Sequence, residues 1–325
     1  MTRVAVMDDW QGVALASADW AKLRARAEVV VFAEPFADED AAAAALADFD
    51  ILIPMRERTP LPASLIARLP KLRMIALTGT RSPSLDLEAC TRHGVVVSNT
   101  GGNASSNGTA ELTLGLMLAA ARRIPAGDAA IRAGRFQEGV GVGPVLEGKT
   151  LGIIGLGRIG GRVAQYGRAL GMRLLAWSRN LTREAAEASG AALAGKEALL
   201  RASDVVTLHV PLAPASRGLI GAAEIALMKP GALLVNTSRA GLVDQAAMLA
   251  ALHEGRIMAA LDVYEREPLP PDDPIRSAPN TVLTPHLGYG SVDTFRQFYA
   301  ESIQNVLAFL DGTPMRVMNS EIVAQ

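Results

Sequence analysis

The feature that most constrains this chain is a glycine-rich turn between a strand pattern and a helix pattern. Residues 150–154 are apolar and β-prone, Gly155-Leu156-Gly157-Arg158-Ile159-Gly160 forms the turn, and 161–170 has helical periodicity. In such a turn the first glycine permits the bend, the second lets a pyrophosphate approach, and the third allows close helix–strand packing. The helix N-terminus adds N–H groups for phosphates. A plain glycine-rich loop is the alternative, but this context predicts a dinucleotide site at Gly155, Gly157, Arg158, Ile159 and Gly160.

The end of the next strand bears on which dinucleotide binds. An enzyme that prefers NAD usually has Asp or Glu about twenty residues after the glycine turn, where it accepts bonds from the ribose hydroxyls. Here the strand over 173–177 ends in Ser178-Arg179-Asn180, with no carboxylate. Arg179 could instead pair with a 2′-phosphate, or lie over the adenine or in solvent. NADP is favoured and NAD is also possible, with Ser178 and Arg179 as contacts.

Two alternations of strands and helices divide the chain. Apolar β-rich runs over 4–7, 29–32, 51–53, 74–77 and 95–97 alternate with helical stretches near 39–48, 61–69 and 84–92. A second series starts at 151, with strands near 151–154, 173–177, 204–208, 232–236, 257–261 and 281–283. Between them lie a polar loop over 99–108 and a largely apolar helix pattern over 109–124. An amphipathic helix is expected at about 293–311.

This rhythm predicts an α/β protein with two doubly wound domains. We expect a flavodoxin-like substrate domain from 1–101 and 292–325, and a Rossmann dinucleotide-binding domain from 102–291. The last helix would then return to the first domain.

Composition excludes several classes of function. The 32 basic and 33 acidic residues are balanced, so nothing indicates binding to nucleic acid or an anionic membrane. No apolar stretch of about 20 residues predicts a membrane span, and the first residues lack a signal-peptide pattern, so we expect a cytoplasmic protein. One cysteine, Cys90, and four scattered histidines predict no metal site.

Five motifs in one order make the chain similar to the D-isomer-specific 2-hydroxyacid dehydrogenase family, which includes phosphoglycerate dehydrogenases and glyoxylate/hydroxypyruvate reductases. They are the turn 155–160, 208–212 (LHVPL) with 216–220 (SRGLI), 228–239 (MKPGALLVNTSR), 260–268 (ALDVYEREP) and 284–288 (TPHLG). The resemblance spans nearly the whole chain. It implies reversible hydride transfer between a nicotinamide and a small anionic 2-oxo or 2-hydroxy acid.

The resemblance also implies three catalytic residues, Arg239, Glu267 and His286. Reduction of a 2-oxo acid builds negative charge on the carbonyl oxygen and requires a proton. Arg239 would hold the substrate, His286 would exchange the proton, and Glu267 would favour the imidazolium. Each residue alone could be a surface charge or part of a turn; their order favours the catalytic interpretation.

By the same resemblance, further residues would contact the cofactor. Asp262 would lie at the carboxamide and Gly288 near the nicotinamide ring; Thr109 stands where the family more often has Val. The remaining cofactor contacts would be His209, Val210, Pro211, Ser216 and Thr237. Val210 and Pro211 could alternatively only terminate a strand.

The substrate end is placed in the first domain. Thr78, Gly79 and Thr80 follow a strand and correspond to a loop that would offer backbone N–H groups to the substrate carboxylate. Arg81 departs from the usual glycine pattern there. Arg56 corresponds to an arginine near the substrate phosphate in phosphoglycerate dehydrogenases, although Glu57 and Arg58 could simply neutralise each other at the surface.

Several alternatives stay open. Formate and phosphite dehydrogenases share the expected architecture, but formate dehydrogenases pair the histidine with glutamine, against Glu267 here. A dinucleotide-sensing corepressor is an alternative from another class, which the complete triad disfavours. The resemblance further implies a homodimer that buries the helix over 109–124 against a second subunit. The physiological substrate is left open.

Overall fold

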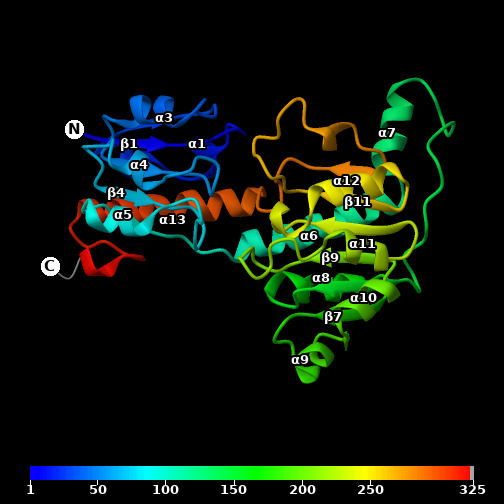
Figure 1. Cartoon of the computed structure of the whole chain (residues 1–325). Coiled ribbons are helices and arrows are strands. Elements are labelled where there is room, and N and C mark those ends of the chain that lie inside the picture. The colour runs from blue at the N-terminus through cyan, green and yellow to red at the C-terminus, as the bar shows by residue number, and fades with distance from the viewer. Residues whose placement is uncertain (323–325) are drawn as a thin grey trace. The chain divides into compact units, whose positions relative to one another are not determined.

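The chain folds into two compact units, each built on one parallel sheet (Figure 1). The structure is a computed structural model that describes residues 1–322. Unit 1 comprises 1–104 and the chain from 291 onward, and unit 2 comprises 105–290. The divisions predicted from the sequence lie at 101/102 and 291/292, and residues 323–325 of the predicted first domain lie outside the described residues.

Unit 1 contains a five-stranded parallel sheet in the order β2-β1-β3-β4-β5. Its strands are β1 (Thr2–Val6), β2 (Ala27–Val31), β3 (Ile51–Ile53), β4 (Met74–Ala76) and β5 (Val96–Ser98). Its helices are α1 (Ala14–Ser17), α2 (Ala21–Arg24), α3 (Glu39–Leu46), α4 (Ala63–Ile66), α5 (Leu87–Arg92), α13 (Val292–Leu310) and the 3₁₀ turn η3 (Ser320–Ile322). The strand order reverses between β1 and β3, so the carboxyl ends of these strands flank a crevice of the kind that binds ligands.

Unit 2 contains a seven-stranded parallel sheet in the order β12-β11-β10-β9-β6-β7-β8. Its strands are β6 (Thr150–Ile154), β7 (Arg173–Trp177), β8 (Ala192–Leu193), β9 (Val205–Leu208), β10 (Ala232–Asn236), β11 (Ile257–Leu261) and β12 (Thr281–Leu283). Its helices are α6 (Asn103–Ala121), α7 (Ile124–Arg132), α8 (Arg158–Ala169), α9 (Arg183–Ala188), α10 (Lys196–Ala202), α11 (Ala222–Leu227), α12 (Gln245–His253) and the 3₁₀ turns η1 (Ala240–Leu242) and η2 (Pro274–Ser277). Here the order reverses between β6 and β9.

Both faces of the unit 2 sheet are covered by helices, which explains why its strands are nearly uniformly apolar. One core joins the sheet to α10, α11 and α12, and the other joins it to α6 and α8. In unit 1, α3, α4 and α5 cover one face through a core that includes Leu46, Ile66 and Cys90. The prediction of two doubly wound α/β sheets is therefore confirmed.

Two helix starts differ from the sequence analysis. Helix α6 begins at Asn103, inside the segment interpreted as loop, and ends at Ala121 rather than at 124. Polar residues such as Ser105 and Asn107 are common in the first turns of helices, so composition alone misplaced this boundary. Helix α8 begins at Arg158 rather than 161, so Gly160 and Gly161 lie inside the helix despite the poor helix propensity of glycine, and Gly160 packs closely against Gly155.

Candidate functional site: a dinucleotide cleft beside a histidine–carboxylate pair

The glycine turn joins β6 to α8 at the reversal point of the unit 2 sheet. Gly155 has φ +100°, and a Cβ there would lie 2.6 Å from the carbonyl carbon and oxygen of His209. A Cβ on Gly160 would lie 2.0 Å from the carbonyl oxygen of Gly155. Gly157, by contrast, faces open space at the start of α8. These three environments match the three roles that glycines play beneath a pyrophosphate.

A cleft of about 480 Å³ opens beside this turn. It is lined by residues from the ends of the glycine turn, β7 and β9, among them Leu156, Gly157, Trp177, Ser178, Arg179, Val210, Pro211 and Ser216. This volume is within the range of small-molecule sites. Its position outside the carboxyl ends of β6, β7 and β9 is where dinucleotides bind in such sheets.

Several predicted cofactor contacts lie in this cleft, but their hydroxyls already have partners. The Ser178 hydroxyl accepts a bond from the Leu156 amide at 3.2 Å. The Ser216 hydroxyl donates to the Pro211 carbonyl at 2.8 Å and accepts from the Ala213 amide, so it closes its own turn. Exposed Arg179 reaches the carbonyl of Ala215 at 3.3 Å. Of these side chains, Arg179 supplies the charge that a phosphate would meet.

Trp177 is a cleft residue that the sequence analysis overlooked. It is the last residue of β7, directly before Ser178, and its partly buried ring lines the cleft. An aromatic side chain at the end of the strand that follows a glycine turn was the available signal, because that position faces the adenosine half of a dinucleotide.

His209 lies at the back of the glycine turn and is not placed to exchange protons. Its Nε2 is shielded and has no hydrogen-bond partner within residues 1–322, although other atoms of the residue are partly exposed. Burial lowers the pKa of the imidazole to about 4, so the ring is neutral at physiological pH. Its carbonyl group packs against Gly155.

His286 and Glu267 form a close pair at the carboxyl ends of β11 and β12. Nδ1 of His286 lies 2.6 Å from Oε2 of Glu267, and the two side chains are 25% and 32% exposed. Oε1 of Glu267 accepts the Tyr264 amide at 2.9 Å. Burial raises the pKa of Glu267, but the bond and charge of His286, the Tyr264 amide and the charge of Arg239 together lower it below its usual value. Glu267 is therefore a carboxylate at neutral pH, so Nδ1 of His286 donates the hydrogen bond between them.

Asp262 fastens the loop that carries His286. One carboxylate oxygen accepts the Thr284 hydroxyl at 2.6 Å and the Leu287 amide at 2.7 Å, and the other accepts the Gly288 amide at 2.8 Å. Burial raises the pKa of Asp262, and these bonds offset only part of that effect. His286 itself has φ 53°, a left-handed conformation that such bonds help to hold.

Arg239 begins the turn after β10, and the side chain of Asn236 shapes that turn. The Asn236 amide group donates to the carbonyl of Arg239 at 2.9 Å, and its oxygen accepts the Ser238 amide at 3.0 Å. The Arg239 guanidinium donates to the Ser238 carbonyl at 2.7 Å. The turn thus fixes a permanent cation whose charge is felt by Glu267.

Three further predicted cofactor residues lie close together in unit 2. A Cβ on Gly288 would lie 3.1 Å from Oδ2 of Asp262 and 3.2 Å from Oγ1 of Thr109. The Thr109 hydroxyl donates to the Ser105 carbonyl. Buried Thr237 shares a hydrogen bond with Thr113 on α6 at 2.9 Å. The backbone of Gly288 is thus held in a space that only glycine fits without displacement.

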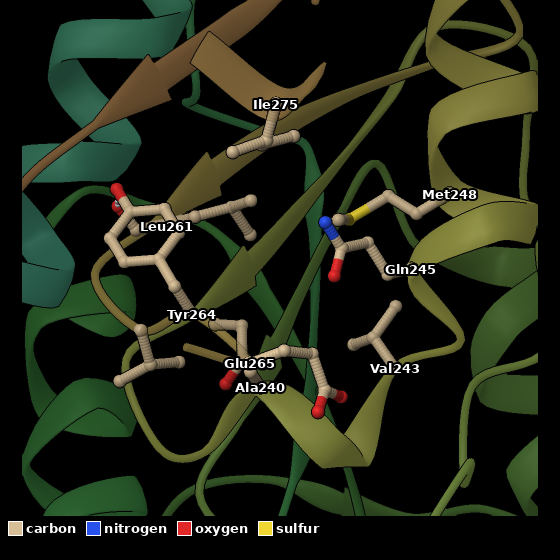
Figure 2. Close-up of a pocket in the computed structure, with 10 residues that line it drawn as sticks. Ala240, Val243, Gln245, Met248, Leu261, Tyr264, Glu265 and Ile275 are labelled. Atoms are coloured by element: carbon tan, nitrogen blue, oxygen red, sulfur yellow. Dashed lines mark hydrogen bonds between the residues drawn. The ribbon is translucent and has the colours of Figure 1, made fainter. Parts of the chain in front are cut away.

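A second, much smaller pocket lies behind the Arg239 turn (Figure 2). Tyr264 and Leu261 lie on one side of it, and Met248, Gln245 and Val243 on the other. With about 20 Å³ of space, it can hold a water molecule but neither a cofactor nor a substrate. The larger cleft beside the glycine turn is therefore the better candidate for the ligand site.

The predicted substrate residues lie in unit 1, at the turns after β3 and β4. The amide of Arg56 donates to Oγ1 of Thr78 at 2.8 Å, and its guanidinium covers Gly79, where a Cβ would lie 1.6 Å from Nη1. Glu57 pairs with Arg56 at 3.4 Å. Arg58 lies 4.4 Å over the Trp10 ring.

The turn after β4 does not present every N–H group that the resemblance suggested. Thr78 is fully buried, and its hydroxyl is used by Arg56 and by the Pro54 carbonyl. The Gly79 amide donates to the Thr100 hydroxyl at 2.7 Å. Within residues 1–322, the amides of exposed Thr80 and Arg81 have no hydrogen-bond acceptor. These two N–H groups, and not that of Gly79, are the ones available to an anion.

Two features are absent from residues 1–322. Residues 1–322 contain no group of three or more His, Cys, Asp or Glu side chains arranged to hold a metal ion. In the same range, no helix has both the length and the apolar character that a membrane crossing requires.

Together, the sheet order, the three glycines and the open cleft define a nucleotide-binding Rossmann domain beside an acid–base pair. Residues 114–288 match the profile of the D-isomer specific 2-hydroxyacid dehydrogenase NAD-binding domain, which indicates a nicotinamide cofactor. The chain belongs to the D-isomer specific 2-hydroxyacid dehydrogenase family.

Named relatives agree with this family. The chain is 42% identical over 268 residues to a glyoxylate reductase of Aeropyrum pernix, covering 80% of each protein. It is also 42% identical over 265 residues to a D-3-phosphoglycerate dehydrogenase of Methanocaldococcus jannaschii, but spans only 50% of that protein. A crystal structure of a phosphoglycerate oxidoreductase from Vibrio cholerae superposes with a TM-score of 0.90 at 38% identity, covering 96% of this chain and 99% of the other.

Proposed function

We propose that this protein is an NAD(P)-dependent 2-oxoacid reductase, or D-2-hydroxyacid dehydrogenase, that uses His286 as proton donor and acceptor. The observation that carries the proposal is the 2.6 Å contact between His286 and Glu267 beside the charge of Arg239. A cation and a proton donor are what the reduction of an anionic carbonyl compound needs. The relatives named glyoxylate reductase support a small 2-oxo acid such as glyoxylate or hydroxypyruvate.

The chain's own groups divide the work as follows. Arg239 pairs with the substrate carboxylate and polarises the carbonyl through its fixed fork of donors. His286, oriented through Nδ1 by Glu267, presents Nε2 to the carbonyl oxygen and gives it a proton as C2 accepts the hydride. The bound nicotinamide supplies or accepts that hydride. In the oxidative direction, His286 takes the proton back from the hydroxyl group.

For the cofactor, we propose a preference for NADP over NAD. Strand β7 ends in Trp177-Ser178-Arg179 with no carboxylate to accept bonds from the ribose, and Arg179 lies at the edge of the cleft. A guanidinium there can pair with a 2′-phosphate. The bond from Arg179 to the Ala215 carbonyl holds the side chain over the cleft without neutralising its charge.

The experiment is a panel of 2-oxo acids assayed with NADPH and with NADH, for the wild type and for His286→Ala. We expect His286→Ala to reduce kcat by at least 100-fold, the scale of a lost general acid, while the Kd for NADPH changes little. The kcat/KM should be higher with NADPH than with NADH. Unchanged turnover in His286→Ala would remove its proposed role, and a clear preference for NADH would remove that of Arg179.

We also propose that the protein is a homodimer. Of the ten large hydrophobic side chains that are exposed among the described residues, five fall between 124 and 145: Ile124, Ile131, Phe136, Val142 and Val145. An exposed apolar cluster of this kind is typical of an interaction surface. It lies on α7 and the segment that follows, and begins at the last residue of the helix over 109–124 that the resemblance indicated.

A further inference from the structure

The turn that carries Arg56 is tied to its neighbours by buried hydroxyl groups. At its far end, Thr59 is 8% exposed and donates to a carboxylate oxygen of Asp8 at 2.8 Å. At its near end, the Thr78 hydroxyl donates to the Pro54 carbonyl and accepts the Arg56 amide, each at 2.8 Å. The turn over 54–59 is therefore held from β1 on one side and from the turn after β4 on the other.

Thr100 holds the next turn in the same way. Its hydroxyl accepts the Gly79 amide at 2.7 Å, and its own amide donates to the Gly79 carbonyl at 3.2 Å. Thr100 is 1% exposed, so this pair of hydrogen bonds to Gly79 is shielded from water. The Gly79 amide is thereby occupied by Thr100, whereas the amides of exposed Thr80 and Arg81 have no acceptor among residues 1–322.

Unusual backbone conformations explain why such fastening is needed. Arg56 has φ 55° and Asp8 has φ 61°, both in the left-handed region that non-glycine residues avoid. Conformations of this kind persist only where surrounding contacts determine them. At Asp8 the Thr59 hydroxyl and the Arg58 guanidinium supply contacts, and at Arg56 the Thr78 hydroxyl does so.

We propose that Thr59 and Thr100 are positioning residues for the substrate, whose hydroxyls hold the Arg56 turn and the Gly79 turn in the arrangement that receives its carboxylate. Neither residue contacts the substrate in this proposal, because the Thr59 hydroxyl is hydrogen-bonded to Asp8 and the Thr100 hydroxyl to Gly79. The proposal rests on the function proposed above. It adds two residues that no motif of the sequence indicated.

The location of both turns agrees with a role in ligand binding. They follow β3 and β4 at the carboxyl edge of the unit 1 sheet, and Asp8 follows β1, next to the point where the strand order reverses. Ligands of doubly wound sheets bind at this edge and near this point. A loop rearrangement there would be felt as weaker substrate binding rather than as a change in the chemistry of His286.

The test compares Thr59→Val with Thr59→Ser, and Thr100→Val with Thr100→Ser, in the full-length enzyme with glyoxylate and NADPH. Valine keeps the shape of threonine and removes the hydroxyl, whereas serine keeps the hydroxyl. We expect each valine variant to raise the KM for glyoxylate about tenfold, with kcat within about threefold of the wild type and the Kd for NADPH unchanged. Each serine variant should restore KM to within about threefold.

Thr91→Val is the matched control, since it removes a threonine hydroxyl bonded to Leu87 and Asn319 elsewhere in unit 1. A thermal melt of every variant reports any general loss of stability. If one valine variant does not fold, the valine and serine variants of the other threonine provide the same comparison.

Hydrogen exchange provides a readout that does not depend on the reaction. The amides of 55–59 should exchange faster in Thr59→Val than in the wild type or in Thr91→Val. A wild type that reduces no 2-oxo acid would contradict the proposed function. The exchange result would still test whether the Thr59 hydroxyl holds the turn over 54–59. A normal KM in both valine variants, or a KM raised equally in Thr91→Val, would overturn the positioning role.

Discussion

At the scale of the residue, Asp8 shows what burial does to a single charge. Its side chain is fully buried, one carboxylate oxygen has no partner among the described residues, and burial raises its pKa to about 6 despite the Thr59 bond and the charge of Arg58. The ordinary value is 3.8. The folded state therefore binds an extra proton between about pH 4 and pH 6.

This shift predicts a pH dependence of stability. Since the folded pKa is the higher one, the contribution of Asp8 is fully present below about pH 4 and is lost as the pH rises through about 6. Asp8→Asn keeps a residue that tolerates φ 61° and an acceptor for Thr59, but removes the charge. Relative to the wild type, it should gain up to ~3 kcal/mol of unfolding free energy between pH 4 and pH 7.

Urea denaturation at the two pH values measures this difference. Asp19→Asn, which removes an exposed carboxylate of the same unit, is the control. A difference between Asp8→Asn and wild type that is the same at both pH values would contradict the predicted titration.

The residues proposed as catalytic show what a motif can and cannot indicate. Arg239, Glu267 and His286 are each common residue types, and only their order and spacing pointed to them. The distances were not predictable, because β10, β11 and β12 bring together side chains that are 19 to 47 residues apart in sequence. The same holds for Thr59 and Thr100, whose partners Asp8 and Gly79 are distant in sequence and carry no motif.

At the scale of the element, two adjacent glycines in the first turn of α8 have opposite surroundings. A side chain on Gly160 would collide with the backbone of Gly155, whereas Gly161 has no atom within 4 Å of an added Cβ. The backbone at Gly155 cannot yield without moving the glycine turn, where we propose that the pyrophosphate binds.

Gly160→Ala should therefore weaken NADPH binding by at least tenfold and destabilise the protein by about 1–3 kcal/mol through overpacking. Gly161→Ala should bind NADPH normally and gain about 0.5–1 kcal/mol, because alanine is the better helix former. Fluorescence titration with NADPH and thermal denaturation compare the pair. Equal effects of the two substitutions would show that the packing at Gly160 is not what the turn requires.

Element boundaries were less predictable than element types. The strands after 150 were foreseen to within one or two residues, except for β8, because buried parallel strands are short apolar runs. Helix α7 and the early start of α6 were not foreseen. Both lie in segments where polar or mixed residues leave helix and loop with similar propensities.

At the scale of the whole molecule, the exposed apolar cluster between 124 and 145 predicts the oligomeric state. Val142 is 96% exposed, and Phe136 is 69% exposed. Burying such side chains against a second copy would remove apolar surface from water, which stabilises a dimer.

The double substitution Phe136→Asp with Val142→Asp should convert a dimer to a monomer at micromolar concentration, as measured by size-exclusion chromatography with light scattering. Leu15→Asp, which alters an exposed apolar residue of unit 1 outside the cluster, should leave the dimer intact. A wild type that is monomeric at the same concentration would rule out the proposed homodimer.

The sequence by itself determined the class of fold and the family. Strand and helix periodicity, the spacing of Gly155, Gly157 and Gly160, and the order of five motifs are local properties of the chain, so they can be interpreted without coordinates. The motifs also contain the residue types that a hydride-transfer site needs.

The tertiary structure alone decided which groups are available. In the folded chain the Gly79 amide bonds to Thr100, and the hydroxyls of Thr78 and Ser216 donate to carbonyl groups of nearby turns. The shielded imidazole of His209 is neutral. The physical reason is that hydrogen-bond partners and burial depend on which distant segments meet. No pattern along the chain contains that information.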